Sequence, residues 1–346
     1  MSRIAIIGAG AWGTALAIVA ARKGHHDVRL WAYEKEVRDA ISASGENSHF
    51  LPGQTVPRSV AVSGDFATVL ADAQIVICAV PSQHCRRIIE QLSQHLRPEM
   101  HLISAAKGLE QTTLLRMTEV IGQVTGGKYP VGAISGPTFA LEVARGDPTA
   151  LTIASEHKPL MAAVQRELSD TAFRIYSNDD VVGVELGGAL KNIIAIAAGI
   201  CDGLGLGHNS AAALITRGLA EITRLVCACG GRSETMAGLA GLGDLVLTCT
   251  GALSRNRSVG VELGRGRKLP DIVAGMHGMI AEGVFTTDAA VQLSQSRGVE
   301  MPITEQMHAI LNQGKPPREA IHELMTRSSK SESQASEGTQ QQSNHT

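Results

Sequence analysis

Residues 4–14 read IAIIGAGAWGT, and this stretch decides the fold. Four apolar residues typical of a buried strand run directly into glycines at positions 8, 10 and 13. A helical pattern follows from Thr14 to Arg22, and a second apolar strand lies at residues 27–31. The stretch therefore predicts a strand, a tight turn and a helix that open a parallel α/β sheet.

Short β-branched runs keep alternating with helical stretches up to about residue 177. The runs that read as strands are residues 3–7, 27–31, 74–80, 101–105, 131–135, 150–154 and 173–176. The continuous apolar run at residues 75–80 suits a strand covered by helices on both faces, because a one-sided sheet would alternate. We therefore predict an N-terminal, doubly wound α/β domain of the Rossmann type over residues 1–182.

The composition changes after residue 182. Long segments rich in alanine, leucine and glycine follow without a clear strand, and residues 214–226 place apolar side chains along one helical face. These segments predict an all-α C-terminal domain over residues 183–327. Residues 328–346 contain almost no apolar side chain and cannot offset the entropy of folding, which predicts a disordered tail.

The overall composition excludes several classes of function. A formal charge of −2 and an aromatic content of 3% argue against a general nucleic-acid binder. The six cysteines form no CxxC pair and no histidines are spaced to complete a metal site, so we predict no metal and a reducing, cytoplasmic location. No uninterrupted apolar run reaches the roughly 20 residues of a membrane span, so we predict no integral membrane segment.

The glycines after the first strand have the spacing of a dinucleotide-binding turn. Gly8 would permit the tight turn, Gly10 would let a pyrophosphate reach backbone amides, and Gly13 would let helix and strand pack closely. The N-terminus of the following helix supplies partial positive charge for phosphates. The alternative is a glycine-rich turn that binds no ligand.

The end of the second strand bears on the choice between NAD and NADP. Tyr33 could stack on an adenine, Glu34 could hold a ribose hydroxyl, and Lys35 could hold a 2′-phosphate. The sequence leaves both cofactors open. Glu34 and Lys35 also read as solvated residues that simply open the next helix.

A single charged residue interrupts the apolar run at residues 186–201. Lys191 has uncharged residues one helical turn away on either side, and an unpaired buried ammonium is costly. Function is one explanation for this lysine. The other is a lysine at the rim of a buried helix, with its stem packed and its head in water.

Further segments suggest a substrate site at the carboxyl ends of the strands. Lys107 follows the strand at 101–105, and residues 135–140 form a loop that opens a helix and presents amides. In the helical half, Asp244 lies among glycines, and Ser254, Arg255 and Asn256 offer charge and donors for a phosphate. Alternatively, Lys107 is a solvated lysine at a strand end, and residues 135–140 are an ordinary helix start. Asp244 could instead cap a helix, and Ser254, Arg255 and Asn256 could lie in a surface loop.

Taken in order, these segments resemble those of the bacterial NAD(P)-dependent glycerol-3-phosphate dehydrogenase family. The resemblance covers about residues 3–327 and is carried by six motifs at residues 8–15, 106–110, 135–140, 186–192, 240–245 and 254–257. It implies reversible hydride transfer between NAD or NADP and the C2 carbon of dihydroxyacetone phosphate or sn-glycerol 3-phosphate. It also implies a cytoplasmic homodimer that supplies phospholipid synthesis.

The resemblance also assigns roles by motif. Lys191 matches the proton donor and acceptor. The substrate-binding positions are Lys107, Gly136, Thr138, Lys191, Asn192, Asp244, Ser254, Arg255 and Asn256. The cofactor-binding positions are Gly8, Gly10, Ala11, Trp12, Gly13, Tyr33, Lys107, Ala140, Arg255, Ile280 and Glu282. Tyr33 departs from the basic residue often found at its position, and Ile280 and Glu282 rest on a weaker match.

Two other readings compete with this one. A β-hydroxyacid dehydrogenase also sets a lysine-bearing helical domain against a Rossmann domain, and its substrate would carry a carboxylate. A non-catalytic dinucleotide sensor would keep the cofactor site alone. The presence of Lys107, Lys191, Asp244 and Arg255 together argues against a sensor.

Overall fold

The computed structural model describes residues 2–276 and 281–328. They divide into two compact units, Met1–Lys107 with Leu115–Val181, and Gly108–Leu114 with Val182–Thr346. The sequence pattern does not predict that Gly108–Leu114 belongs to the second unit. Leu109 of this segment is buried in the apolar core of that helical unit. The predicted tail, apart from residue 328, lies outside the described residues.

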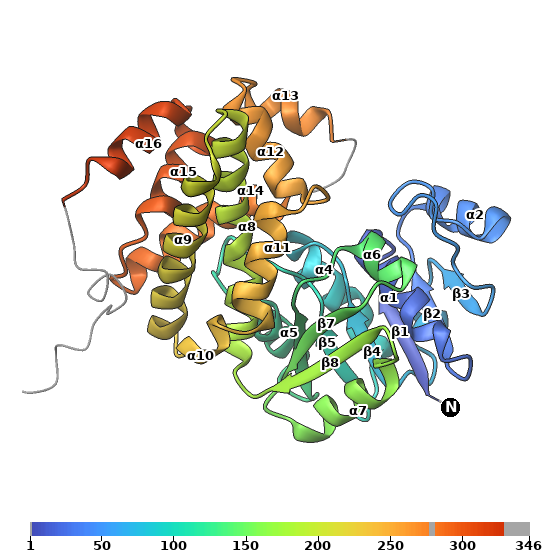
Figure 1. The fold of residues 1–346 in the computed structure, drawn as a ribbon. Helices are drawn as coiled ribbons and strands as arrows, with labels where there is room; N and C mark the ends of the chain where they lie inside the picture. The colour runs from blue at the N-terminus through green and yellow to red at the C-terminus, as the bar shows by residue number, and fades with distance from the viewer. Residues whose placement is uncertain (1, 277–280, 329–346) are drawn as a thin grey trace, which may run out of the picture. The chain divides into compact units, whose positions relative to one another are not determined.

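The first unit is built on one eight-stranded sheet with the order β3-β2-β1-β4-β5-β6-β7-β8 (Figure 1). Its strands pair in parallel except for β6 and β7, which are antiparallel. The strands are β1 (Arg3–Ile7), β2 (Asp27–Trp31), β3 (Val60–Ser63), β4 (Ile75–Cys78), β5 (His101–Ser104), β6 (Val131–Ser135), β7 (Thr149–Ala154) and β8 (Phe173–Asn178).

Helices bury both faces of this sheet, which confirms the doubly wound prediction. Along β1, Ile4 and Ile6 belong to one apolar core, whereas Ala5 and Ile7 belong to another. The first core takes buried residues from α1 (Ala11–Arg22), α2 (Lys35–Ser44), α6 (Ala140–Arg145) and α7 (Lys158–Leu168). The second takes them from α3 (Phe66–Leu70), α4 (Ser82–Leu92) and α5 (Met117–Thr125).

Two details of the sheet differ from the sequence prediction. Strand β3 was not predicted, because it is a four-residue edge strand in which only Val60 is buried. Strand β7 runs antiparallel to β6, and an apolar run does not reveal strand direction. The chain folds back tightly here, since a Cβ at Gly136 would lie 2.8 Å from the Cα of Leu151.

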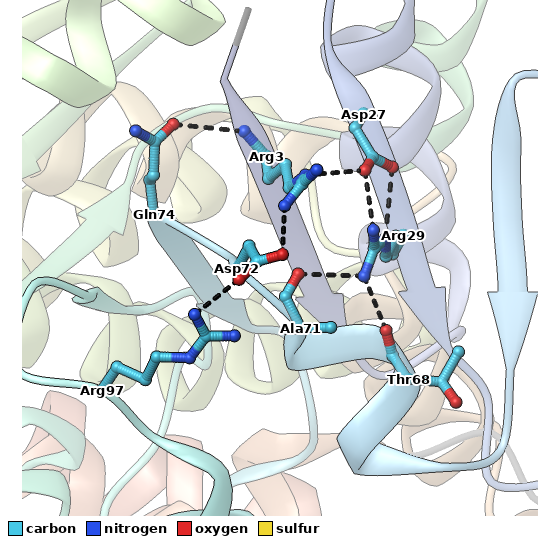
Figure 2. A network of polar contacts seen from close by, with 8 residues as sticks. All are labelled: Arg3, Asp27, Arg29, Thr68, Ala71, Asp72, Gln74 and Arg97. Carbon is cyan, nitrogen blue, oxygen red and sulfur yellow. Dashed lines mark hydrogen bonds and ion pairs between the residues drawn. The ribbon is translucent and has the colours of Figure 1, made fainter.

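Charged side chains tie together the amino-terminal ends of the strands (Figure 2). Arg3 pairs with Asp27 of β2 at 3.2 Å and with Asp72, which precedes β4. Asp72 also pairs with Arg97 at 2.5 Å. Arg29 pairs with Asp27 at 2.8 Å and donates to the carbonyl oxygens of Thr68 and Ala71. These contacts hold α3 and the loop before β4 to this edge of the sheet.

The second unit is helical, as predicted, and is built around α8 (Val181–Gly203). Every residue of α8 from Gly183 to Ile200 is buried. The other helices are α9 (His208–Ala228), α10 (Ser233–Met236), the π-helical turn η2 (Leu239–Gly243), α11 (Asp244–Thr250), α12 (Arg255–Gly264), α13 (Leu269–Ala274), α14 (Glu282–Ser296), α15 (Pro302–Gln313) and α16 (Pro317–Met325).

Helix α8 is the one described helix with the length and hydropathy of a membrane span, or one of two if the bent pair at residues 233–250 and 255–264 counts as a span. The tested window of α8 is 89% buried inside the protein. Core helices of soluble proteins have the same character, so the length and hydropathy of α8 are weak evidence for a membrane span.

Candidate functional site

The glycine turn between β1 and α1 has the geometry that its sequence predicts. Gly8 has a φ of +111°, and a Cβ there would lie 2.9 Å from the carbonyl oxygen of Ala79. A Cβ at Gly13 would lie 1.8 Å from the carbonyl oxygen of Gly8, so only glycine lets α1 approach the strand. By contrast, nothing lies within 4 Å of the Cβ position at Gly10. Gly10 therefore faces open space, where a phosphate could approach the backbone.

A buried asparagine that sequence reasoning missed holds this turn in place. Asn47 is fully buried and donates from Nδ2 to the carbonyl oxygen of Ala9 at 2.7 Å and to Thr14 Oγ1 at 2.8 Å. Its Oδ1 accepts from the amide of Phe50 at 3.1 Å. Asn47 lies 38 residues beyond Ala9 in sequence, so nothing in the local pattern of the turn indicates this contact.

The residues around the turn fit a dinucleotide. Helix α1 begins at Ala11 with Gly10 as its N-cap, and no side chain caps it, so its first amides remain available for phosphate oxygens. The indole Nε1 of Trp12 is buried and has no hydrogen-bond partner among the described residues. A bound polar group could satisfy this donor. Ala140, another predicted cofactor position, is the first residue of α6.

At the end of β2, the structure places a basic residue that the sequence prediction did not consider. Tyr33 is 66% exposed, as a stacking residue would need to be. Lys35 pairs with Asp39 at 2.6 Å on the exposed surface of α2. Arg38 instead reaches back, and its Nη1 donates to the carbonyl oxygens of Ala32 at 2.7 Å and Tyr33 at 2.8 Å.

Three predicted substrate positions of the first unit meet at the carboxyl ends of β5 and β6. Lys107 Nζ donates to the carbonyl oxygen of Gly136 at 2.9 Å and to Thr138 Oγ1 at 3.3 Å. Thr138 Oγ1 in turn donates to the carbonyl oxygen of Gly136 at 3.0 Å. The structure thus brings Lys107 into contact with Gly136 and Thr138. From the sequence, these two segments were expected only to end at the same edge of the sheet.

Lys191 lies in a buried polar cluster in the second unit. Its Nζ donates to Asp244 Oδ1 at 2.8 Å and to Thr248 Oγ1 at 2.6 Å. Lys191 is 5% exposed and Asp244 1% exposed, so the alternative of a rim lysine with its head in water is wrong. Thr248 Oγ1 donates to the carbonyl oxygen of Asp244 at 2.6 Å, so its lone pairs face the ammonium.

Close backbone packing explains how Asp244 reaches Lys191. A Cβ at Gly187, one turn before Lys191 on α8, would lie 2.8 Å from the carbonyl oxygen of Ala240. Ala240 belongs to the π-helical turn η2, which leads directly into Asp244, the first residue of α11. Glycine at 187 therefore lets η2 approach α8 and positions the carboxylate beside the lysine. The alternative of a helix cap at Asp244 does not apply, because Gly243 is the N-cap of α11.

The two predicted asparagines bind each other rather than standing apart. Asn256 Nδ2 donates to Asn192 Oδ1 at 3.0 Å, and Asn256 Oδ1 accepts from the amide of Gly283 at 3.0 Å. Both side chains are buried. The pair links α8, α12 and the first turn of α14. Asn192 is the residue that follows Lys191 in sequence.

The start of α12 presents the remaining predicted phosphate-binding residues. Ser254 caps the helix by accepting from the amide of Arg257 at 3.2 Å. Arg255 follows and is exposed. Although part of the side chain is exposed, desolvation of the guanidinium lowers the pKa of Arg255, and the negative charge of Glu282, another predicted position, opposes this shift. Ile280, the last predicted cofactor position, lies outside the described residues.

The predicted residues thus form two groups, one in each unit. Gly8 to Gly13, Tyr33, Lys107, Gly136, Thr138 and Ala140 belong to the sheet unit. Lys191, Asn192, Asp244, Ser254, Arg255, Asn256 and Glu282 belong to the helical unit. Sequence reasoning missed Asn47, Arg38 and Thr248, whose hydrogen-bond partners are known only from the structure.

Comparison with known proteins gives consistent matches along the whole described chain. The family model for the NAD-dependent glycerol-3-phosphate dehydrogenase N-terminus matches residues 3–161, and the model for the C-terminus matches residues 180–322. Similar proteins named glycerol-3-phosphate dehydrogenase (NAD(P)+) include one from Koribacter versatilis, 64% identical over 96% of this chain and 99% of that protein. Another, from Acidobacterium capsulatum, is 54% identical over 96% of this chain and 100% of that protein.

A solved structure gives the same result. The crystal structure of glycerol-3-phosphate dehydrogenase from Coxiella burnetii superimposes with a TM-score of 0.90 at 43% identity, covering 94% of this chain and 99% of that chain. A ketopantoate reductase structure from Ralstonia eutropha has a TM-score of 0.58 at 16% identity, which shows likeness of fold alone.

Proposed function

This chain belongs to the NAD-dependent glycerol-3-phosphate dehydrogenase family, and from that premise we propose that it reversibly reduces dihydroxyacetone phosphate to sn-glycerol 3-phosphate. It is an NAD(P)-dependent oxidoreductase that acts on a CH–OH group. The product is the starting alcohol for phospholipid synthesis. The observation that carries the proposal is the buried contact of Lys191 with Asp244 and Thr248.

The chemistry needs a proton as well as a hydride. When bound at the glycine turn, NADH or NADPH would supply the hydride for the carbonyl carbon. The ketone oxygen then gains negative charge, and an ammonium within hydrogen-bond reach both stabilises that charge and donates the proton. We assign this role to Lys191. Asp244 compensates its positive charge in the buried site, and Thr248 fixes the direction of the Cε–Nζ bond.

We assign phosphate recognition to Arg255 of the helical unit and propose that Lys107 and Thr138 of the sheet unit also bind substrate. Arg255 lies at the N-terminus of α12, where the helix dipole also favours an anion. Lys107 and Thr138 offer a second set of donors at the ends of β5 and β6. Because phosphate is bound equally in the ground and transition states, Arg255→Ala should raise KM for dihydroxyacetone phosphate about 10-fold or more with kcat little changed. An unchanged KM would remove Arg255 from this role.

The decisive experiment replaces the lysine. Lys191→Ala should lower kcat by about 10³-fold or more, because both charge stabilisation and proton donation are lost. NADH affinity, measured by fluorescence titration, should stay within about threefold of wild type, since the glycine turn is built by other residues. Lys128→Ala, an exposed lysine, is the matched control and should retain full activity. Loss of NADH binding together with turnover would mean that Lys191 is structural.

Substrate class and assembly complete the proposal. Initial rates with dihydroxyacetone phosphate should exceed those with any carboxylate-bearing β-hydroxyacid, and the reverse order would favour the β-hydroxyacid dehydrogenase reading.

We further propose that the protein is a cytoplasmic homodimer. Family resemblance implies the dimer, and the absence of a CxxC pair supports the cytoplasmic location. Light scattering coupled to gel filtration should give twice the 36.3 kDa chain mass.

A further inference from the structure

Two adjacent histidines and a glutamate gather at the amino-terminal edge of the sheet. His25 and His26 lie in the connection between α1 and β2, and Glu167 is near the end of α7. The strands β1 and β2 begin beside them, at Arg3 and Asp27. The glycine turn and Lys107 lie at the opposite, carboxyl edge, so this cluster is not part of the dinucleotide site.

The geometry of the cluster suits a small cation. One ligand atom from each of His25, His26 and Glu167 lies within 4.8 Å of the others. The two imidazole centroids are 4.2 Å apart. Donors around a bound Zn²⁺ lie about 2.0–2.2 Å from the metal, so a shift of up to about 1 Å per ligand would close this triangle on an ion.

An independent feature points to a missing ligand. The side chain of His26 is completely buried, yet its Nδ1 has no hydrogen-bond partner within residues 2–276 and 281–328. Buried polar atoms are almost always satisfied, so an orphaned imidazole nitrogen needs an explanation. The ring therefore has binding capacity that the protein's own groups do not use.

The surrounding groups orient the ligands as those of a metal site do. His25 Nδ1 is 2.8 Å from the carbonyl oxygen of Lys23, and His26 Nε2 is 3.1 Å from the carbonyl oxygen of Glu167. Metal-binding histidines typically hold one ring nitrogen on a carbonyl in this way, which leaves the other with its lone pair.

We propose that His25, His26 and Glu167 form a structural binding site for a divalent transition metal of the Zn²⁺ class. Two imidazoles and one carboxylate favour Zn²⁺, Co²⁺ or Ni²⁺ over Mg²⁺ and Ca²⁺, which prefer oxygen ligands. The site would fasten the end of α7 to the connection before β2. The histidine spacing alone predicts no metal site, because the third ligand lies 141 residues further along the chain.

Metal titration of the full-length, metal-free protein tests the site. Co²⁺ should bind with one-to-one stoichiometry and give visible absorption bands, and Zn²⁺ should displace it and raise Tm. Glu167→Gln and His25→Ala should each weaken Co²⁺ binding about 10-fold or more. His25 is exposed, so its replacement leaves folding intact, and the matched control His49→Ala should bind like wild type.

Activity provides a separate readout. Because the cluster lies at the edge opposite the glycine turn, His25→Ala should keep wild-type kcat and KM in metal-free buffer. The proposal is overturned if no saturable one-to-one binding occurs, or if His25→Ala binds Co²⁺ as tightly as wild type. In either case the assignment of dehydrogenase activity is unaffected, since it rests on Lys191.

Discussion

Lys191 shows how an ammonium is tolerated inside an apolar helix. Its partners come from α11, 53 and 57 positions further along the chain, rather than from its own helix. A buried ion pair is weak evidence for stability, since apolar residues of similar volume are often as stable. As the only charge in the run at residues 186–201, Lys191 is therefore better explained by chemistry than by folding.

Replacement of Thr248 tests the positioning of that ammonium. Thr248→Val keeps the shape but removes the oxygen that accepts from Lys191 at 2.6 Å. A hydrogen bond to a charged group is worth about 1.5–3 kcal/mol, so kcat should fall about 10- to 100-fold. KM for NADH should not change. Steady-state kinetics with dihydroxyacetone phosphate gives both values.

The conservative variant separates this role from a structural one. Thr248→Ser retains the hydroxyl and should recover most of the wild-type kcat. If Thr248→Val and Thr248→Ser have equal kcat, the hydroxyl does not position Lys191.

Individual site residues could be identified from the sequence where a charged residue stood among residues of a different kind. Lys191 was conspicuous as one charge in an apolar run, and Asp244 as a carboxylate among glycines. Thr248 and Asn47 were not, because a threonine in a helix and an asparagine in a loop are ordinary until their partners are known. Their function as positioning groups exists only in the tertiary contacts.

At the scale of elements, glycines let α8 and α12 pack backbone against backbone. A Cβ at Gly199 would lie 2.0 Å from the carbonyl oxygen of Arg257, and one at Gly260 would lie 2.0 Å from that of Ile196. Gly203 and Gly264 repeat the contact one turn later. This packing carries Ser254 and Arg255, at the start of α12, to a fixed place along α8.

A single methyl group should disrupt this packing. Gly260→Ala places a carbon where the Ile196 carbonyl already lies, and such overpacking typically costs about 1–3 kcal/mol, with backbone clashes at the upper end. We expect a lower free energy of unfolding in urea and a raised KM for dihydroxyacetone phosphate. Gly122→Ala is the matched control, because nothing lies within 4 Å of its Cβ position in α5.

That control should be neutral or stabilising by about 0.5–1 kcal/mol, since alanine favours a helix. If Gly260→Ala were as neutral or stabilising as Gly122→Ala, helix propensity, and not the contact between α8 and α12, would determine the result.

Elements were predictable where burial on both faces gave long apolar runs, as in β1, β4 and β5. The edge strand β3 escaped prediction because it has little to bury. The reversed direction of β7 and β8 also escaped, because strand direction depends on how the connection through α6 packs rather than on local residue types.

Across the whole molecule, pH acts on stability through carboxyl groups of two kinds. The pKa of Asp72 is lowered by hydrogen bonds with Arg97, and that of Asp65 by hydrogen bonds with Thr68. A lowered folded-state pKa contributes stability above the unfolded value that is lost in acid. Glu221 belongs to the opposite kind, since burial raises its pKa from 4.5 to about 7.

Glu221 connects α9 to the start of α15. Its Oε1 accepts from the amide of Ile303 at 2.7 Å, and its Oε2 accepts from the amide of Thr304 at 3.3 Å. These bonds favour the carboxylate, but desolvation at 2% exposure outweighs them. The folded state therefore holds a proton between pH 4.5 and about 7 that the unfolded chain releases. The resulting stability is fully present below pH 4.5 and is lost as pH rises through 7.

Glu221→Gln should remove this dependence, because an amide stays neutral at every pH. The free energy of unfolding of Glu221→Gln minus that of wild type should increase by about 3 kcal/mol from pH 5 to pH 8, because burial raises the pKa of Glu221 from 4.5 to about 7. Urea unfolding at several pH values measures the difference. Glu323→Gln is the control, because hydrogen bonding to Lys315 lowers the pKa of that exposed carboxyl, so any change should be small and of opposite sign. A constant difference between Glu221→Gln and wild type across pH would mean that Glu221 is ionised in the folded protein throughout, held by the amides of α15.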